Sequence, residues 1–397
     1  MKKIGILTHY ANSTNYGGLL QAYALVRAVN NISSEFNAVQ ICTQYKTEMG
    51  PVYSEDCKNI FKRIKGKTIF EIVNKFHEKI DFVCNSRRFG VLQHDNFEKR
   101  IKIFKKFEES IAHFDFNHNT YKMERLNNIF DIFVVGSDQV WNPNWFYAPF
   151  YLDFANDDKL KISYAASMGV SSLTEKQQEV IISLVEKFDF ISVREQTAKD
   201  LLSQYVNKEI CTVCDPVLLL SSKEWNQIAE SPLQNQKYIY SYLLGDRKEN
   251  RDIATRISKM CGLPIAAVPF VHMNYNSYDK KFIDIEVNDV GPAEFVGLIR
   301  DGSTVVTDSF HCVVFSIIYK KKFIALHRSA GDSKESMNSR LTDLLAELGL
   351  SDRIVTDKSQ ISDEFLCKDI DYDKVHKILD EKKELSKEFL EAALDRI

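Results

Sequence analysis

The sequence lacks the segments that direct a protein into or across a membrane. No run of apolar residues approaches the roughly 18 residues that a membrane-spanning helix needs. The opening stretch, Met1–Tyr10, is too short and too polar for the apolar core of a signal peptide. We therefore expect the protein to be cytoplasmic.

The sequence also lacks a disulfide or metal framework. Its eight cysteines are scattered over the chain, which is typical of reduced thiols. The one Cys-x-x-Cys pair, Cys211 and Cys214, lies in a segment with strand character, where residues three apart face opposite sides. No second cysteine pair and no His-Glu-x-x-His motif accompanies it, so no metal site is predicted.

A basic excess is missing as well, because the net charge is -3 over 397 residues. A general nucleic-acid binder would be strongly basic, so nucleic acid is not expected as a partner. The glycine spacing of the dinucleotide fingerprint is absent from the first polar turn, Asn15–Gly18. What the sequence does have is 44% hydrophobic and 12% aromatic residues, enough for a large core in more than one domain.

Strand-like and helix-like segments alternate along most of the chain. Short apolar runs such as Ile129–Val135 are typical of buried strands, and Leu19–Val29 has the spacing of an amphipathic helix. A second alternating set begins at Lys237, after a polar stretch. The pattern predicts an α/β fold with two Rossmann-like domains that face a cleft, residues 1–222 and 223–371.

Two segments depart from this alternation. Residues 57–125 are rich in lysine and amphipathic, which predicts a helical insertion in the N-terminal domain. Basic helices of this kind can contact an anionic membrane peripherally, which would hold the protein at the inner face of the membrane. The alternative is a solvated face whose apolar side covers the sheet. The final segment, residues 372–397, is predicted to be a helix that packs back on the N-terminal domain.

The stretch Ser303–Leu326 predicts a strand, a turn, a helix and a strand. Asp308 and Ser309 precede the apolar helical run, which puts His311 in the first helical turn, just past the carboxyl end of a strand. Open α/β sheets bind ligands at that edge, and helix amides attract anions there. His311 is thus a candidate catalytic group, and the alternative is a core histidine that pairs with Asp308.

Two further strands end in polar groups. Ile129–Val135 runs into a loop with Asp138, Gln139 and Trp141, whose amide, carboxylate and ring suit a carbohydrate site. Alternatively, Asp138 caps a turn and Trp141 fills the core. Arg194 ends another predicted strand, where a guanidinium can bind phosphate or carboxylate or can pair with a nearby carboxylate.

Taken together and in order, these motifs resemble the polysaccharide pyruvyl transferase family, over Lys2 to about Arg353. The matching pieces are Asn15-Tyr-Gly-Gly with Gln21-Ala-Tyr-Ala-Leu25, Val135-Gly-Ser-Asp-Gln-Val-Trp-Asn-Pro143, Ile162-Ser-Tyr-Ala-Ala-Ser167, Ile191-Ser-Val-Arg-Glu195, Asp215-Pro216, Gly291-Pro292 and Thr307-Asp-Ser-Phe-His311 with Phe315-Ser316. Each piece is common by itself, but the ordered combination is specific.

The resemblance implies a two-domain fold like that of GT-B glycosyltransferases. It also implies transfer of pyruvate from phosphoenolpyruvate, as a ketal, to two hydroxyls of a sugar, with release of phosphate. The acceptor would be an exopolysaccharide or a lipid-linked glycan of the cell envelope, and phosphoenolpyruvate would be a co-substrate rather than a cofactor. The alternatives are a glycosyltransferase of the same shape with a nucleotide-sugar donor, or a non-catalytic glycan-binding relative.

Donor-site roles follow from the matched positions. The resemblance implies that His311 is catalytic and that Arg194 binds an anionic group of the donor, with Ser309 and Phe310 beside it. Characterised members carry Arg-Leu-His where this chain has Ser309-Phe310-His311, so one arginine is missing. From the residues themselves, we predict that Arg328 or Arg340 supplies that charge.

The acceptor site is predicted from the turns after two strands. Asp138 is the candidate base that activates the acceptor hydroxyl. The residues expected to bind the acceptor sugar are Asn15, Tyr16, Gly17, Gln139 and Trp141. The glycine pair after Tyr16 either lets the ligand approach the backbone or only shapes the turn.

Overall fold

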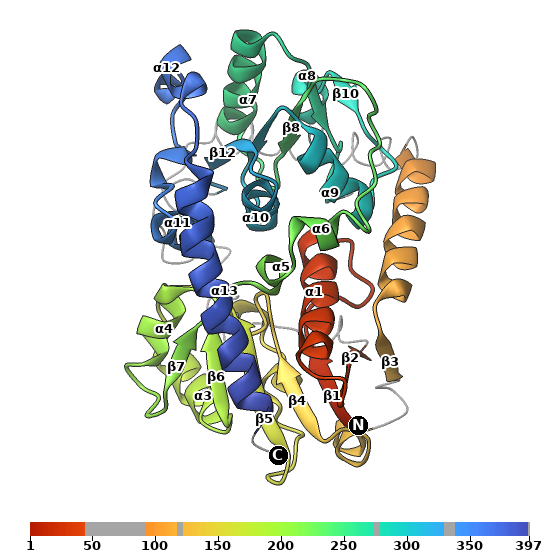
Figure 1. Ribbon diagram of the computed structural model, residues 1–397, viewed down its shortest axis with the longest axis vertical. Coiled ribbons are helices and arrows are strands. Elements are labelled where there is room, and N and C mark those ends of the chain that lie inside the picture. Colours follow the sequence, from red (N-terminus) through yellow and green to blue (C-terminus); the bar gives the residue numbers. More distant parts are fainter. Residues whose placement is uncertain (44–92, 117–121, 273–275, 277, 329–337, 396–397) are drawn as a thin grey trace, which may run out of the picture.

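The computed structural model describes residues 1–43, 93–116, 122–272, 276, 278–328 and 338–395. Its N-terminal half holds a parallel sheet in the order β3-β2-β1-β4-β5-β6-β7 (Figure 1). The strands are β1 Lys2–Leu7, β2 Phe36–Thr43, β3 His113–Phe116, β4 Ile132–Val135, β5 Leu160–Ala166, β6 Phe190–Val193 and β7 Ile210–Thr212. Because helices cover both faces of a parallel sheet, an inner strand such as β4 is apolar and buried along its whole length.

The C-terminal half holds a second parallel sheet in the order β10-β9-β8-β11-β12-β13. Its strands are β8 Ile239–Tyr242, β9 Ile265–Ala267, β10 Ile285–Glu286, β11 Thr304–Thr307, β12 Lys322–Leu326 and β13 Ile354–Val355. Two parallel sheets with interleaved helices confirm the predicted α/β fold class.

The helices connect successive strands. In the first half they are α1 Tyr16–Ile32, α3 Glu175–Val185 and α4 Gln196–Leu202, with α5 Pro216–Leu219 and α6 Ser222–Trp225 leading to the second sheet. The second half holds α7 Lys248–Cys261, α8 Asp279–Phe282, α9 Pro292–Asp301, α10 Phe310–Ile318, α11 Ser339–Glu347 and α12 Asp363–Cys367.

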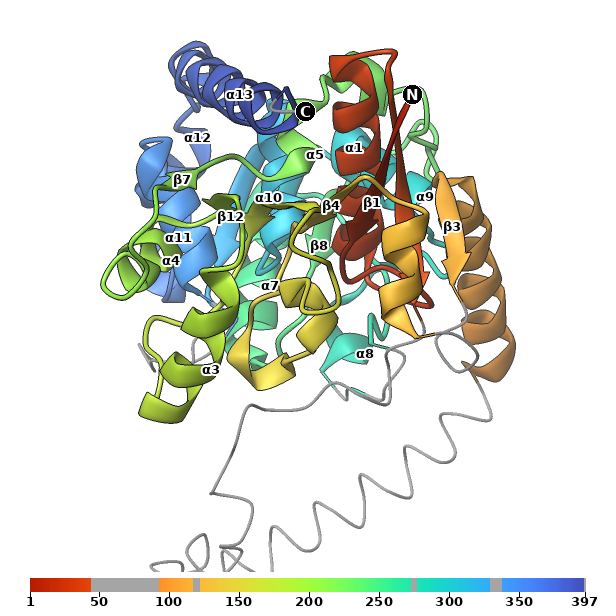
Figure 2. The same cartoon turned by 90° about the horizontal axis from the view of Figure 1, so that it is seen from below.

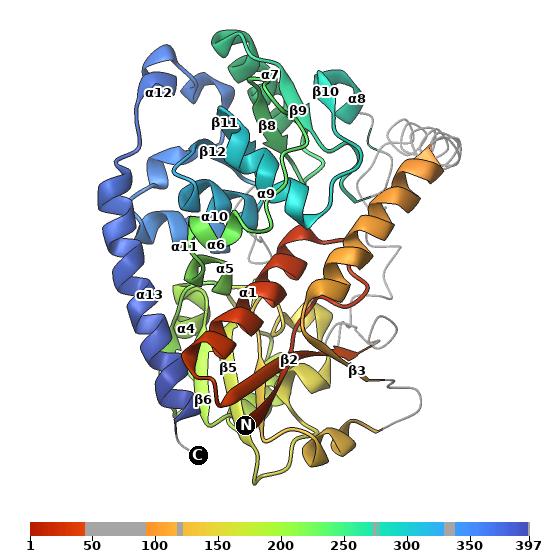
Figure 3. The same ribbon diagram turned by 45° about the vertical axis from the view of Figure 1, so that its right-hand side comes forward.

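The last helix, α13 Tyr372–Leu394, runs from the second half down along the first (Figures 1 and 3). The Ser386 hydroxyl accepts a hydrogen bond from the backbone N–H of Cys214 at 2.9 Å. The Phe389 ring lies 6.5 Å from the ring of Tyr164 on β5. The chain end therefore packs against the first sheet.

The predicted helical insertion falls partly outside the described residues, and the part inside them is not wholly helical. Residues 93–110 form a helix, but β3 then pairs in parallel with β2 at the sheet edge (Figures 2 and 3). The prediction was wrong for β3, because the short run His-Phe-Asp-Phe takes its conformation from pairing with β2 rather than from helical periodicity.

The described part of the insertion turns its apolar side inward. Phe104 is buried against the ring of Tyr16, at 4.7 Å, whereas Lys99, Lys102 and Lys105 are exposed. This is the solvated-face alternative for residues 93–110, and residues 57–92 and 117–121 of the predicted membrane-contacting segment lie outside the described residues. Over the described ranges, the structure holds no helix with the length and apolarity to cross a membrane.

Arg100 joins this helix to the second half of the molecule. Its buried guanidinium donates to the carbonyl oxygens of Asn288, Phe270 and Pro269 at 3.2, 3.3 and 3.2 Å. Nearby, the hydroxyl of Tyr16 donates to the carbonyl of Val290 at 2.9 Å. These bonds hold the start of α1 against the loops of the second sheet.

We expect Arg100→Met to lower the free energy of unfolding by about 2 to 3 kcal/mol, because buried carbonyls lose a charged donor. Urea unfolding followed by circular dichroism measures the change. Lys102→Met, on the exposed side of the same helix, serves as the matched control and should change stability by about 0.5 kcal/mol or less. Equal stabilities of the two variants would contradict a linking role for Arg100.

Candidate active site

A cavity of about 670 Å³ lies between the two sheets and takes its walls from both halves of the chain. The carboxyl ends of β1, β4, β8 and β11 lead into it, as expected for ligand sites of open α/β sheets. The lining residues that matter for chemistry are His9, Asn15, Asp138, Gln139 and Trp145 from the first half and His272, Ser309, Phe310, His311, Arg328 and Arg340 from the second.

His311 reaches this cavity from the first turn of α10, where the sequence predicts it. Its imidazole is mostly buried and lies against α1, the first helix of the other half. A Cβ at Gly17 would lie 2.0 Å from Nδ1 of His311, so only glycine leaves room for the ring. Gly17 is therefore buried beneath the histidine, and its role is to position His311 rather than to contact a sugar through an open backbone.

The carboxylate that faces His311 is Asp215, which sequence reasoning did not assign to the site. Oδ2 of Asp215 lies 3.6 Å from Nε2 of His311, slightly beyond hydrogen-bond length, so the contact is chiefly electrostatic. Burial favours the neutral acid, but His311 and Arg194 hold the pKa of Asp215 well below its ordinary value. An ionised Asp215 at this distance orients the imidazole of His311.

The sequence alternative, a pairing of His311 with Asp308, is not what the structure shows. The Asp308 carboxylate accepts hydrogen bonds from the backbone N–H groups of Leu244 and Gly245 at 2.7 and 2.8 Å. The signal that could have found the true partner is the dipeptide Asp215-Pro216, where aspartate caps α5 by accepting from the N–H of Val217 at 3.0 Å. Capping holds Oδ1, while Oδ2 faces His311 and also accepts a hydrogen bond from Nη1 of Arg194.

Arg194 is the centre of a buried ion cluster and not an open anion ligand. Its Nη1 lies 2.7 Å from Asp215, its Nε 3.0 Å from Glu195 and its Nη2 3.6 Å from Asp138. The Phe310 ring covers the guanidinium at 4.3 Å from its centroid. The predicted direct binding of the donor by Arg194 is corrected accordingly, because three carboxylates already balance its charge.

Arg328 and Arg340 are the cations at the cavity wall beside His311. The Nη2 of Arg328 donates to the carbonyl of Asp308 at 3.4 Å, and Nη1 of Arg340 lies 3.6 Å from Asp138. With the amide oxygen of Gln139 turned toward it, Arg340 also donates to that oxygen at 2.9 and 2.8 Å. Burial and the charge of Arg194 lower the pKa of Arg340 to about 10, which leaves it a cation at neutral pH.

Asp138 is buried between Arg194 and Arg340, in a left-handed backbone conformation with φ of 65°. Burial raises the pKa of its carboxyl, but Arg194, His311 and Arg340 outweigh this and hold the pKa below its ordinary value. Asp138 is therefore ionised, as a base must be, although the surrounding cations weaken its basicity.

His9, which follows β1, is a cavity residue that sequence reasoning missed. Its Nε2 lies 3.2 Å from the carbonyl oxygen of Gln139, which makes Nε2 the donor nitrogen. Burial lowers the pKa of His9, so its imidazole is neutral near pH 7. The ring packs edge-on against Phe150, with the ring centroids 4.5 Å apart.

The predicted acceptor residues divide between the cavity and the core. Asn15 is exposed at the cavity, and its side chain accepts from the N–H of Gly17 to cap α1. Gln139 lies in the cavity wall as well. Tyr16 is corrected to a core residue, because its ring is buried and stacks on Phe295 at 4.8 Å.

Trp141 is likewise corrected from a sugar-stacking residue to a core residue. It is 0% exposed, its Nε1 donates to the carbonyl of Phe150 at 3.1 Å, and its ring stacks on Tyr151 at 5.9 Å. The tryptophan that does line the cavity is Trp145, four residues later, which is 41% exposed. Both lie in the same loop, so only the turn over Pro143–Trp145 separates their environments.

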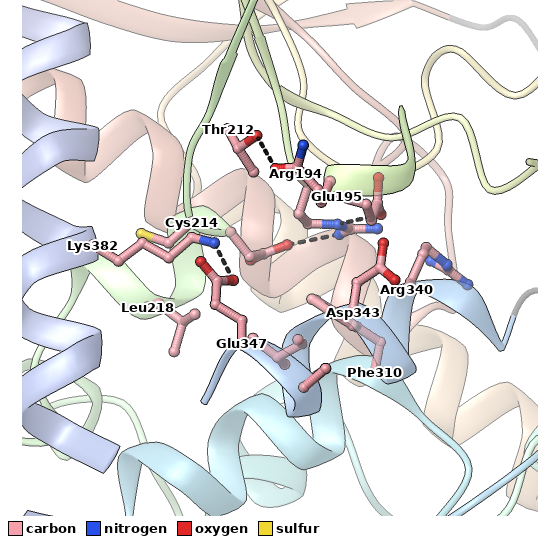
Figure 4. A pocket seen from close by; sticks show the side chains of 14 residues that line it. Arg194, Glu195, Thr212, Cys214, Leu218, Phe310, Arg340, Asp343, Glu347 and Lys382 are labelled. Atoms are coloured by element: carbon pink, nitrogen blue, oxygen red, sulfur yellow. Dashed lines mark hydrogen bonds and ion pairs between the residues drawn. The ribbon is translucent and has the colours of Figure 1, made fainter. Parts of the chain in front are cut away.

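A second cavity, of about 440 Å³, shares Phe310 and Arg340 with the first (Figure 4). Its wall carries the ion pair of Lys382 with Glu347, and Asp343 lies beside it. Within the described ranges, no group of three or more histidine, cysteine, aspartate or glutamate side chains is arranged to hold a metal.

Two parallel-sheet halves that face a cleft define the GT-B class of α/β proteins, as predicted. UGT89C1 of Arabidopsis thaliana superposes with a TM-score of 0.50 and 10% identity, over 98% of this chain and 98% of that one. The UDP-GlcNAc 2-epimerase of Methanocaldococcus jannaschii has a TM-score of 0.48 and 13% identity, over 96% of this chain and 92% of that one. The UDP-GlcNAc 2-epimerase of Neisseria meningitidis has a TM-score of 0.48 and 9% identity, over 98% of this chain and 94% of that one. At these identities the likeness concerns the fold alone.

Sequence comparison, rather than the fold, identifies the family. The model of the family described as polysaccharide pyruvyl transferase matches residues 15–329. The chain belongs to the polysaccharide pyruvyl transferase family, as the ordered motifs predict. A search of curated proteins finds no match.

We expect Trp141→Ala to lower the free energy of unfolding by about 3 to 5 kcal/mol, because it opens a cavity in the core. Trp145→Ala is the control, because Trp145 lies in the same loop but its ring is exposed. It should lower the free energy of unfolding by about 1 kcal/mol or less. Urea unfolding followed by circular dichroism compares the two. Similar losses for both variants would contradict the different placement of the two rings.

We expect Asp215→Asn to change how stability depends on pH. A carboxyl whose folded pKa is depressed adds stability above its unfolded value of about 3.9, and this stability is lost as the pH falls through the folded value. The variant should be less stable than the wild type at neutral pH, and the difference should shrink in acid. Urea unfolding from about pH 7 to pH 3 tests this, and parallel curves for the two proteins would contradict it.

Proposed function

We propose that this protein transfers the pyruvyl group of phosphoenolpyruvate to two hydroxyls of a sugar as a ketal, with release of phosphate. The acceptor is a polysaccharide or a lipid-linked glycan precursor. The observation that carries the proposal is the arrangement of His311, backed by Asp215, in one cavity wall with the cations Arg328 and Arg340. Membership of the family supports the transferase class.

The donor carries a phosphate and a carboxylate, and both need positively charged or N–H donors. Arg328 and Arg340 supply guanidinium groups, and the first turn of α10 supplies backbone amides at the positive end of a helix. Ser309 makes no side-chain capping bond to α10, so its hydroxyl is a further donor. Arg194 acts indirectly, because it holds Asp138 and Asp215 in place.

The reaction requires two carbon–oxygen bonds to form and one to break. The first sugar hydroxyl adds to the central carbon of phosphoenolpyruvate, and the methylene carbon gains a proton to become a methyl group. The bond to phosphate then breaks as His311 donates a proton to the departing oxygen. The second hydroxyl adds to the same carbon, and its proton restores His311. The two hydroxyl protons thus end on the methyl group and on phosphate.

Asp138 accounts for the first proton. Its ionised carboxylate lies in the same cavity as His311 and can accept the proton of the first hydroxyl as that oxygen attacks. Asp138 then passes this proton to the methylene carbon, which forms the methyl group and restores the carboxylate. Because Arg194 and Arg340 hold the pKa of Asp138 low, Asp138 can accept the hydroxyl proton only while the hydroxyl oxygen is already bonding to the central carbon of phosphoenolpyruvate. Asp138 therefore contributes to the rate less than His311 does.

The test is phosphate release from phosphoenolpyruvate across a panel of acceptor glycans. We expect His311→Asn to keep the fold and to lower turnover about 100- to 10,000-fold, because asparagine can donate a hydrogen bond but not a proton. His94→Asn is the control, since the His94 side chain is 66% exposed on the helix of residues 93–110 and does not line the cavity. Its turnover should stay close to that of the wild type.

Two results would contradict the proposal. One is a His311→Asn enzyme whose folded fraction turns over normally. The other is thermal stabilisation by nucleotide sugars and none by phosphoenolpyruvate, which would favour a glycosyltransferase with the same fold.

A further inference from the structure

Trp145 presents an aromatic ring in the wall of the active-site cavity. It is 41% exposed, whereas the other two tryptophans, Trp141 and Trp225, are each 0% exposed. In the described part of the chain, Trp145 is the one exposed large hydrophobic side chain that also lines this cavity. An aromatic ring that is open to a ligand cavity is available to contact a bound ligand.

The backbone that carries Trp145 is held by a proline and by local hydrogen bonds. The turn η4, Pro143–Trp145, begins with proline, and the side chain of buried Asn142 caps it by accepting from the N–H of Asn144 at 2.9 Å. The N–H of Trp145 donates to the carbonyl of Asn142 at 3.0 Å. The preceding Trp141 is fixed in the core. The loop is therefore ordered before a ligand binds, and a ligand that stacks on the ring loses little binding free energy to ordering the loop.

The polar groups that line the same cavity suit a sugar. Ser13, Thr14, Asn15 and Gln139 bring hydroxyl and amide groups to the same cavity. Such groups hydrogen-bond to sugar hydroxyls, while an indole ring covers the C–H face of a pyranose. A ring bearing a C–H face and several hydroxyls satisfies both kinds of group at once.

We propose that Trp145 forms a sugar-stacking subsite that binds a pyranose of the acceptor glycan by its C–H face. The proposal rests on the proposed function, because it names where the acceptor of that reaction binds. Stacking on one face orients the hydroxyls at the ring edge toward the cavity. Trp145 thereby selects pyranoses whose C–H groups gather on one face.

Fluorescence gives a direct test, because Trp145 is the one tryptophan that a water-soluble quencher reaches. The protein is titrated with the methyl pyranosides of glucose, galactose, mannose and N-acetylglucosamine, and quenching by acrylamide is measured at each step. We expect at least one pyranoside to protect the wild type from quenching. In Trp145→Ala, both the quenchable emission and the sugar-dependent protection should disappear.

Kinetics provide the second readout. In the phosphate-release assay, Trp145→Ala should raise the KM for the acceptor about 10-fold and leave the KM for phosphoenolpyruvate unchanged, because the ring contributes contact area and no charge. Trp145→Phe keeps a smaller ring, so its KM for the acceptor should lie between those of the wild type and Trp145→Ala. Tyr205→Ala is the matched control, since Tyr205 is 40% exposed and lies at the end of α4, away from the cavity.

The outcomes separate the subsite from the reaction. If a pyranoside protects Trp145 from quenching but no phosphate is released, the proposed subsite stands and the proposed function is wrong. If phosphate is released but the acceptor KM is the same in Trp145→Ala and the wild type, the proposed reaction stands and the proposed subsite is wrong. Failure of every pyranoside to protect Trp145, or equal effects of Trp145→Ala and Tyr205→Ala, also overturns the subsite.

Discussion

The buried guanidinium of Arg194 is the interaction on which the rest of the site depends. It contacts Asp138, Glu195 and Asp215, which follow β4, β6 and β7. An isolated charge at this depth would be costly to desolvate, and the three carboxylates offset that cost while Arg194 does the same for them. The cluster therefore fixes three loops of the first sheet relative to one another at the edge where the cavity opens. The Oδ2 of Asp215 that accepts from Arg194 is also the oxygen that faces His311.

The site is complete only when both halves of the chain meet. His311, Arg328 and Arg340 come from the second half, while Asp138, Asp215 and Gly17 come from the first. Phe310 lies over Arg194, so the turn that carries His311 packs directly on the ion cluster. Arg100 and Tyr16 bond to carbonyls of the second half on another side of the interface. Catalytic geometry is thus maintained by the same contacts that hold the halves together.

Sequence reasoning found the residue types of the site but not all of the positions. His311, Arg328 and Arg340 were predictable because each follows a strand or a helix boundary, and those positions meet at one edge of an α/β sheet. Trp141 and Trp145 could not be told apart, since a loop has no periodicity that says which ring points inward. The strand at His113–Phe116 was missed for a related reason, because its conformation comes from pairing with β2.

By itself the sequence determined the α/β class, the family and the place of His311 at the start of a helix, because apolar periodicity, capping residues and ordered motifs are local properties of the chain. Tertiary structure alone decided which charges meet. Arg194 lies 21 residues from Asp215, and Asp215 lies far from His311 in sequence, yet packing brings all three into contact. Whether an arginine binds a substrate or a neighbouring carboxylate depends on distances of a few ångströms between segments, which no local pattern specifies.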